Sequence, residues 1–149
     1  MNSSERTLRA VRTLVQFDLA QRGADVAQAA ALCAGAKREM NAVTQRCNSA
    51  MREMRSVQER SAIDPALFAA VHALLSIERH ELRESQTRLV ELTEREQQAR
   101  AALADVRNRD RSVERALQAE QREQRLEQQV QDILRADDMW LQRRQEDVS

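Results

Sequence analysis

Few side chains in this sequence could carry catalytic or metal chemistry. The two histidines, His72 and His80, lie eight residues apart, without a cysteine or paired carboxylate at metal-ligand spacing. The only glycines, Gly23 and Gly35, do not form the glycine-rich loop that cradles a phosphate. We therefore expect a protein that is not an enzyme and has no catalytic residue, cofactor site or metal site.

Charge and hydropathy argue against two further classes of protein. Lys and Arg number 24 against 24 Asp and Glu, so the net charge gives no general attraction to nucleic acid or acidic lipid. Arg6, Arg9 and Arg12 are the nearest approach to a basic stripe, and no aromatic residues interleave with them. The chain has no signal pattern and no apolar run of about 18 residues. We expect a cytoplasmic protein that neither binds nucleic acid nor inserts into a membrane.

The second half of the chain sets the architecture. Neither glycine nor proline follows Pro65, and a helix from there to about residue 146 would reach roughly 120 Å, too long for the core of a globule. Its apolar residues recur with the 3,4 spacing of a coiled-coil heptad. This seam consists of Val71, Leu75, Leu82, Leu89, Leu92, Ala99, Leu103, Val106, Val113 and Leu117.

The first half carries a matching seam. Asn2, Ser3 and Ser4 offer N-cap acceptors, so a helix should begin near Ser4. Each of the two glycines weakens a helix by up to ~1 kcal/mol, but the 3,4 phase continues through both of them. The seam residues are Leu8, Val15, Leu19, Val26, Ala29, Cys33, Ala36, Met40, Val43, Cys47, Ala50, Met54 and Val57, with Arg12 and Arg22 as interruptions.

One break separates these halves, at residues 61–64. Asp64 is a good N-cap and Pro65 a good first helical residue. A loop this short between two long helices favours antiparallel pairing. Residues 1–60 hold ten bases and six acids, whereas 61–149 hold fourteen bases and eighteen acids, and these opposite signs favour the same pairing.

We therefore predict an all-α fold, an elongated antiparallel two-helix coiled-coil hairpin. It forms a single unit over residues 1–149, as a monomer, with helices at about 4–60 and 65–146. A register in which facing residue numbers sum to about 120 would bring Arg12 near Asp110 and Arg22 near Glu96. Extension of both arginines into solvent is an equally reasonable alternative.

The helices are unequal in length, so the chain beyond about residue 118 has no intrachain partner in a flush hairpin. A new apolar stripe appears there, formed by Leu126, Val130, Ile133, Leu134, Met139, Trp140 and Leu141. An uncovered stripe that includes the only tryptophan is a candidate partner surface. The alternative is a bend near Ser76 to Ser85 that makes a short helical tip segment and lets the stripe pack on Leu8 to Leu19.

With these features the chain resembles the FliJ/YscO family, the coiled-coil stalk proteins of flagellar and injectisome type III secretion. The similarity lies in its length, the capped first helix, the break before the apolar segment Phe68 to Ile77, and the C-terminal helix rich in Gln, Glu and Arg. Arg125 to Gln129 and Asp137 to Arg144 resemble the family's ending, in which an acidic pair precedes an apolar residue and then basic ones.

The resemblance implies a cytoplasmic rod at the base of a bacterial secretion apparatus. Its paired termini would enter the pore of a hexameric secretion ATPase, and it would contact the export-gate membrane protein and export chaperones. The implied ATPase-binding residues are Arg6, Arg9, Leu126, Val130, Ile133, Asp137, Trp140, Arg143 and Arg144. The implied gate-binding residues, nearer the hairpin tip, are Phe68, His72, Leu75 and Arg79. Whether the system is flagellar or an injectisome stays open.

A second function from another class is a generic coiled-coil scaffold or holdase chaperone that binds varied clients through a hydrophobic tip. In that case Phe68, Val71, Leu74 and Leu75 would matter more than Trp140. The structural rival is an oligomer in which the two helices pair between chains.

Overall fold

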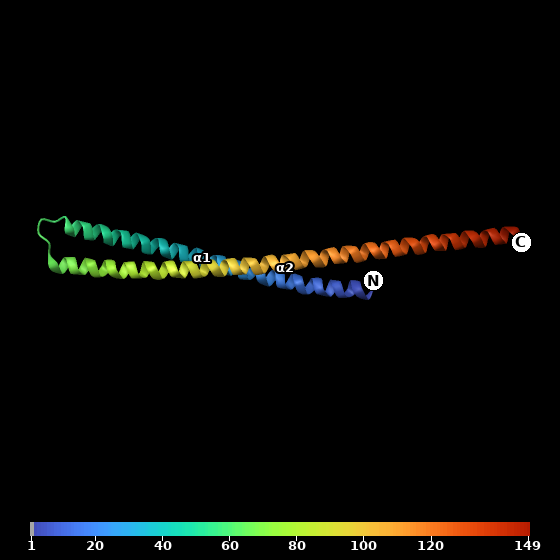
Figure 1. The fold of residues 1–149 in the computed structure, drawn as a ribbon, viewed down its shortest axis with the longest axis horizontal. Coiled ribbons are helices and arrows are strands. Elements are labelled where there is room, and N and C mark those ends of the chain that lie inside the picture. The colour runs from blue at the N-terminus through green and yellow to red at the C-terminus, as the bar shows by residue number, and fades with distance from the viewer. Residues whose placement is uncertain (1) are drawn as a thin grey trace. The chain divides into compact units, whose positions relative to one another are not determined.

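The computed structural model describes residues 2–149, which fold into two long helices (Figure 1). Helix α1 spans Ser3–Gln58 and helix α2 spans Pro65–Val148. No strand occurs in residues 2–149, and the helices pack against each other as the antiparallel hairpin that the sequence predicts. Helix α1 ends two residues earlier than predicted, and α2 continues two residues further.

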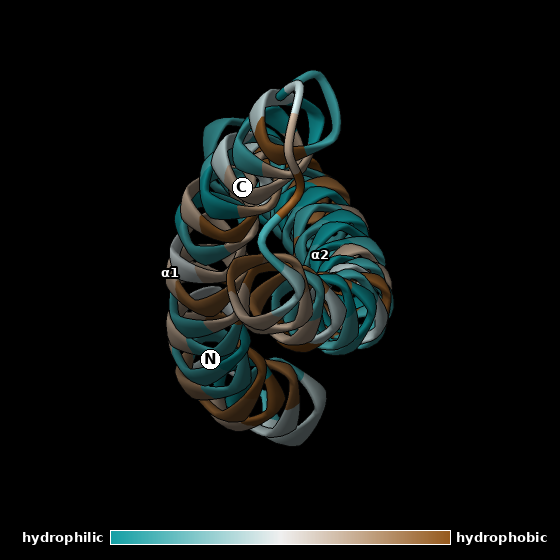
Figure 2. Ribbon diagram, turned by 90° about the vertical axis from the view of Figure 1, so that its left-hand side faces the viewer, coloured by the Kyte–Doolittle hydropathy of each residue, from teal (hydrophilic) through white to brown (hydrophobic). Residues whose placement is uncertain are grey.

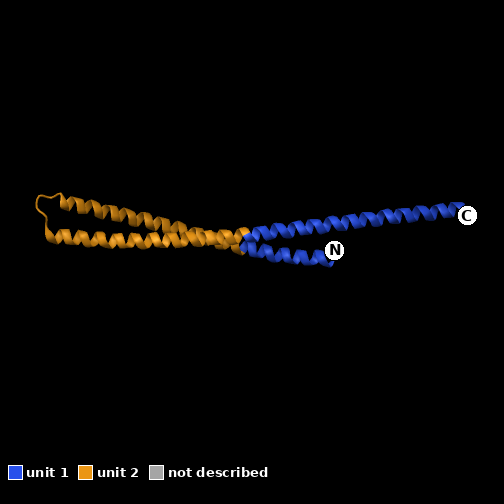
Figure 3. Cartoon of the chain, viewed as in Figure 1, with its two compact units in different colours: residues 1–20, 105–149 blue, residues 21–104 orange. Residues whose placement is uncertain are grey.

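The chain divides into two compact units, which are described separately (Figure 3). Unit 1 consists of Met1–Ala20 and Asp105–Ser149, and unit 2 of Gln21–Ala104. Each unit therefore contains a stretch of both helices. Hydrophobic and hydrophilic residues are interspersed on both α1 and α2 in Figure 2.

Side-chain caps define where both helices begin. Asn2 Oδ1 accepts a hydrogen bond from the Glu5 backbone N–H at 2.8 Å, so Asn2 is the N-cap among the three candidates. At the start of α2, Asp64 Oδ1 accepts from the Ala66 N–H at 3.0 Å, and the Asp64 carbonyl accepts from the Phe68 N–H at 2.9 Å. These bonds satisfy N–H groups that lack helical partners, and they confirm Asp64 as the N-cap of α2.

The core of unit 2 lies beside the hairpin turn and is built from the predicted seams. Its buried cluster consists of Cys47, Ala50, Met54, Val57, Val71 and Leu75. Cys33, Ala36 and Val43 extend the buried face along α1. Both cysteines are free, and the Cys33 Sγ lies 3.6 Å from the Thr93 Oγ1.

Helix α2 passes through Ser76 to Ser85 without interruption, so the alternative with a bend and a separate tip segment is wrong. The physical reason is that Leu75, just before this stretch, and Leu82, within it, keep the seam phase and pack in the cluster that α1 and α2 share. Ser85 is itself buried at a seam position.

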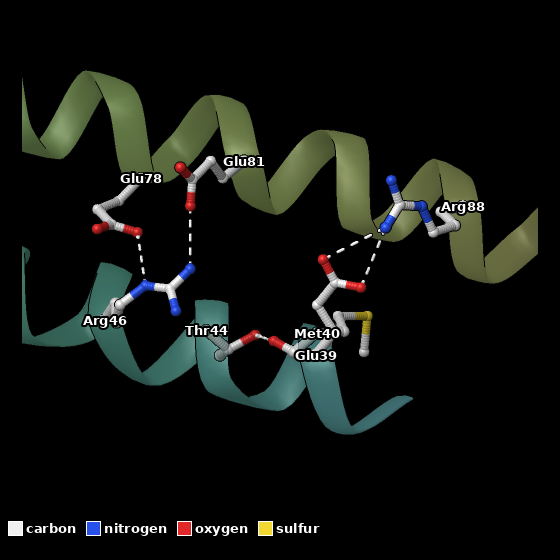
Figure 4. Close-up of polar contacts among 7 residues, drawn as sticks. All are labelled: Glu39, Met40, Thr44, Arg46, Glu78, Glu81 and Arg88. Carbon is white, nitrogen blue, oxygen red and sulfur yellow. Dashed lines mark hydrogen bonds and ion pairs between the residues drawn. The ribbon is translucent and has the colours of Figure 1, made fainter. Parts of the chain in front are cut away.

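Ion pairs fix the register within unit 2 (Figure 4). The Arg46 guanidinium lies 3.2 Å from the Glu78 carboxylate and 2.9 Å from that of Glu81. Arg88 lies 3.1 Å from Glu39, where the predicted register would have placed residue 81 opposite Glu39. Within unit 2 the predicted register was therefore wrong by roughly one to two helical turns along α2. In unit 1, where Asn2 contacts Glu120, it agrees closely with the observed pairing.

The two expected interhelical ion pairs do not form. Arg22 is exposed and lies 3.6 Å from Asp25 on its own helix, while Glu96 pairs with Arg100 at 2.6 Å. Within unit 1, the Arg12 Nε and the Asp110 Oδ1 are buried without hydrogen-bond partners. Neighbours four or three residues away compete well with a partner on the other helix, because they share one helix face.

Two adjacent leucines offer a test of the predicted core. Leu75 is 7% exposed and belongs to the buried cluster, whereas Leu74 is 42% exposed. We expect Leu75→Ala to lower the free energy of unfolding by about 2–3 kcal/mol, because it leaves a cavity. Leu74→Ala should change it by less than about 1 kcal/mol. Urea unfolding followed by circular dichroism at the helical band measures both, and equal effects would contradict the packing described.

Candidate functional site

The C-terminal part of α2 in unit 1 has no helix beside it (Figure 3). The start of α1 lies against Glu120, which accepts hydrogen bonds from the Asn2 amide and, at 3.4 Å, from the Ser4 hydroxyl. From there α2 continues to Val148, a further distance of about 40 Å. Every residue from Arg125 to Ser149 is exposed, so α1 covers none of this segment, which we call the tail.

The tail carries the predicted apolar stripe, and nothing in the described chain covers it. Its members are between 50% and 62% exposed: Leu126, Val130, Ile133, Leu134, Met139, Trp140 and Leu141. Packing of the stripe on Leu8 to Leu19, the alternative left open by the sequence, does not occur. A contiguous apolar face on an exposed helix is typical of a partner-binding surface.

The stripe does not simply prolong the seam that pairs α1 with α2. A 3,4 seam consists of two lines of residues, each repeating every seven positions. Leu134 and Leu141 continue the line of α2 that contains Val106 and Val113. The other line, which contains Leu103 and Leu117, continues through the polar residues Gln124, Gln131 and Asp138. Leu126, Ile133 and Trp140 instead recur every seven residues, one position before the first line. Since each residue turns a helix by about 100°, the apolar face of the tail is rotated away from the intrachain seam.

Charged groups border the stripe near its end. The Arg144 guanidinium lies over the Trp140 ring, 5.1 Å from its centroid, in a cation–π contact. Leu141, Arg144, Gln145 and Val148 line a shallow hollow of about 370 Å³. Tryptophan and arginine are both among the residue types enriched at binding hot spots.

The structure does not bring all nine implied ATPase-binding residues together. All nine are exposed, and all belong to unit 1. Arg6 and Arg9 lie in the first turns of α1, which begins against Glu120, whereas Trp140 is twenty residues beyond Glu120 along α2, a further distance of about 30 Å. The expected cluster at paired chain ends is therefore two separate groups within this unit.

Arg9 is held by an acid that the sequence analysis missed. Its guanidinium donates to Glu5 at 2.6 Å, and Glu5 is only 5% exposed. Burial raises the pKa of Glu5. The hydrogen bond and positive charge of Arg9, together with the nearby Gln124 amide, lower it by more. The pKa of Glu5 therefore lies below its ordinary value of 4.5. The seam phase could have found it, because Glu5 stands three residues before Leu8.

The sequence analysis missed two further features of unit 1, a polar hollow and a pair of exposed apolar side chains. A polar hollow of about 630 Å³ lies between the helices, lined by Arg9, Arg12, Gln16, Glu114 and Gln121 among others. On α1, Leu14 and Phe17 are 70% and 72% exposed. Both fall outside the 3,4 seam, and that position was the available signal that they lie at the surface.

Three of the four implied gate-binding residues lie at the surface of unit 2. Phe68 is half-buried and its ring stacks on that of the exposed His72, with centroids 6.2 Å apart. Arg79 is exposed, whereas Leu75 is buried in the core and supports this surface from beneath. Exposed apolar side chains at the tip come instead from Ile63, Leu74 and Ile77.

Other kinds of site are not evident in residues 2–149. No group of three or more His, Cys, Asp or Glu residues there could hold a metal ion. Neither helix is long and apolar enough, within the same residues, to cross a membrane. Comparison of the chain with protein-family models, curated proteins and solved structures gives no match.

The lowered pKa of Glu5 predicts a pH dependence with a defined sign. Because the pKa is lower in the folded than in the unfolded state, ionised Glu5 stabilises unit 1 above pH 4.5. This contribution is lost as the pH falls through the folded-state pKa. We expect a pH titration of the Glu5 carboxyl, followed by carbon-13 NMR, to have its midpoint below pH 4.5. In Arg9→Met the midpoint should move upward, because Arg9 no longer offsets the effect of burial.

Arg6→Met is the matched control, since Arg6 is exposed and makes no ion pair with Glu5 in the described structure. It should leave the Glu5 midpoint where it is in the unchanged protein. A midpoint at or above 4.5 in the unchanged protein would show that Arg9 does not govern this carboxylate.

Proposed function

We propose that the protein is the central stalk of a bacterial type III secretion system, binding the hexameric secretion ATPase and coupling it to the export gate. The observation that carries the proposal is the tail, a helix about 35 Å long that lacks an intrachain partner and exposes an apolar stripe. The resemblance of its ending to the FliJ/YscO family supplies the identity of the partner. Its location would be the cytoplasmic base of the secretion apparatus.

The tail fits the demands of a ring pore. A single helix is about 10–12 Å wide, so a tail without a companion can enter a narrower channel than a helix pair can. Trp140, Ile133 and Val130 would supply apolar contacts, and Arg143 and Arg144 would meet acidic groups of the ring. Because one helix presents different side chains to each of six subunits, its contacts are necessarily asymmetric. Such contacts would favour ring assembly and link ATP turnover to the stalk.

The separation of Arg6 and Arg9 from Trp140 refines this proposal. In unit 1 these arginines lie where α1 begins, so they would meet the entrance of the ring while the tail lies deeper. Arg9 is already paired with Glu5, which leaves Arg6 as the more available charge. The gate would bind the surface of unit 2 that carries Phe68, His72 and Arg79. Export chaperones would be further partners.

The exposed apolar tip supports the second candidate, a scaffold or holdase. Ile63, Leu74 and Ile77 are at least 42% exposed there, and a client chain could bind them. Suppression of client aggregation that depends on Leu74 and Ile77 but not on Trp140 would favour this second function.

Replacing Trp140 and Ile133 by Ala tests the stalk proposal. Both side chains are more than half exposed, so helicity should be nearly unchanged. Binding to the purified hexameric secretion ATPase of the same bacterium should weaken by about 2–4 kcal/mol if they are hot spots, and ATPase stimulation should fall with it. Isothermal titration calorimetry and phosphate release measure the two effects.

The matched control replaces Gln128 and Gln142, on the polar face of the tail, by Ala. This variant should bind and stimulate the ATPase like the unchanged protein. Full stimulation by the Trp140 and Ile133 variant would count against the stalk assignment.

A further inference from the structure

We propose that the tail also pairs, in antiparallel orientation, with the tail of a second copy of this chain. The occupant of the apolar stripe would then be the stripe of an identical molecule, and the contact would be a two-fold symmetric interface. The inference rests on the charge pattern around Trp140 and does not depend on the proposed function.

Charges of opposite sign flank the middle of this contact. Asp137 and Asp138 precede Trp140, and Arg143 and Arg144 follow Leu141. Reversing the helix about the bond between Trp140 and Leu141 exchanges the acidic pair with the basic pair. At about 100° per residue, Asp137 and Arg144 lie on the same face of the tail as Ile133 and Trp140, whereas Asp138 and Arg143 lie to either side of it. In an antiparallel pair, Asp137 of each copy therefore meets Arg144 of the other. A parallel pair would instead place like charges side by side, which disfavours it.

These four charged residues are exposed and available to a partner. Asp137, Asp138 and Arg143 make no ion pair within residues 2–149, and Arg144 contacts the Trp140 ring. Side chains on one helix meet at separations of three or four residues. Asp138 to Arg143 is five residues and Asp137 to Arg144 is seven, so neither acid reaches its complementary base on the same helix.

The same reversal also aligns apolar side chains. Trp140 would face the partner's Leu141, and Ile133 would face the partner's Val148, a side chain that is 84% exposed in the single chain. Each of these contacts occurs twice because of the two-fold axis, so the pattern is self-complementary along residues 133–148.

The length of the overlap sets the strength of the dimer. It spans about 24 Å of helix, little more than four turns, so association should be weak and dependent on concentration. The dimer would cover Trp140 and Ile133. It would therefore exclude any other partner that uses the same stripe, including the ATPase ring if the stalk proposal is correct. Such a dimer would protect the stripe in the free protein.

Charge exchange in the full-length protein tests the inference by sedimentation equilibrium across the micromolar range. Two variants, Asp137→Arg with Asp138→Arg and Arg143→Asp with Arg144→Asp, place like charges opposite each other in a homodimer. We expect each to raise the dimer dissociation constant at least about tenfold. The variant with all four changes restores opposite charges, so it should dimerise within about threefold of the unchanged protein.

Mixing the two double variants in equal amounts should produce a heterodimer, because one tail is then wholly basic and the other wholly acidic at these positions. Circular dichroism confirms that every variant keeps its helices. A monomer at every concentration for the unchanged protein would overturn the inference, as would double variants that dimerise as tightly as the unchanged protein. Ring binding is measured separately, so failure of the dimer and failure of the stalk proposal remain distinguishable.

Discussion

A two-helix hairpin can bury only one face of each helix, and this limit governs the rest of the molecule. The buried face is narrow, and on α1 it is built largely from small or flexible side chains, such as Cys33, Ala36, Ala50 and Met54, whereas the buried apolar residues of α2 are only Val and Leu. Small side chains let the helix axes approach closely, so a thin seam can hold two long helices together. Every other apolar side chain must lie at the surface, and α2 loses even its seam partner where α1 begins.

Polar contacts set the register of this apolar seam without contributing much to its stability. Arg46 with Glu81 and Arg88 with Glu39 are exposed pairs that each contribute a few tenths of a kcal/mol, whereas Glu78, which also pairs with Arg46, is partly buried. A seam of similar apolar residues could slide by one heptad at modest cost, and these pairs penalise that slip. In unit 1 the buried and unpaired Arg12 Nε and Asp110 Oδ1 replace apolar contacts. Local opening of unit 1 should therefore be easier.

Features that depend on local periodicity could be predicted from the sequence. Predictions of how residues far apart in the chain pack together were less successful. The seams, the Asp64 cap and the uncovered tail follow from 3,4 spacing and from helix length, which one chain displays directly. The register in unit 2 failed because matching Arg22 to Glu96 ignored partners available three or four residues away. Burial of Glu5 was missed because acids are rarely assigned to a seam. Leu75 was assigned to a binding surface, although its position in the same seam already indicated burial.

The tail is preorganised for binding because it is the continuation of a longer helix. An isolated helix of this length would be marginal in water, since the first turn is costly to form. Here the paired part of α2 supplies that nucleus, and the tail only has to propagate from Glu120 onward. A partner then meets a helix that is already ordered, with the Trp140 ring held against Arg144, so little conformational entropy is lost on association. The unequal length of the two helices thus creates both the exposed surface and its preorganisation.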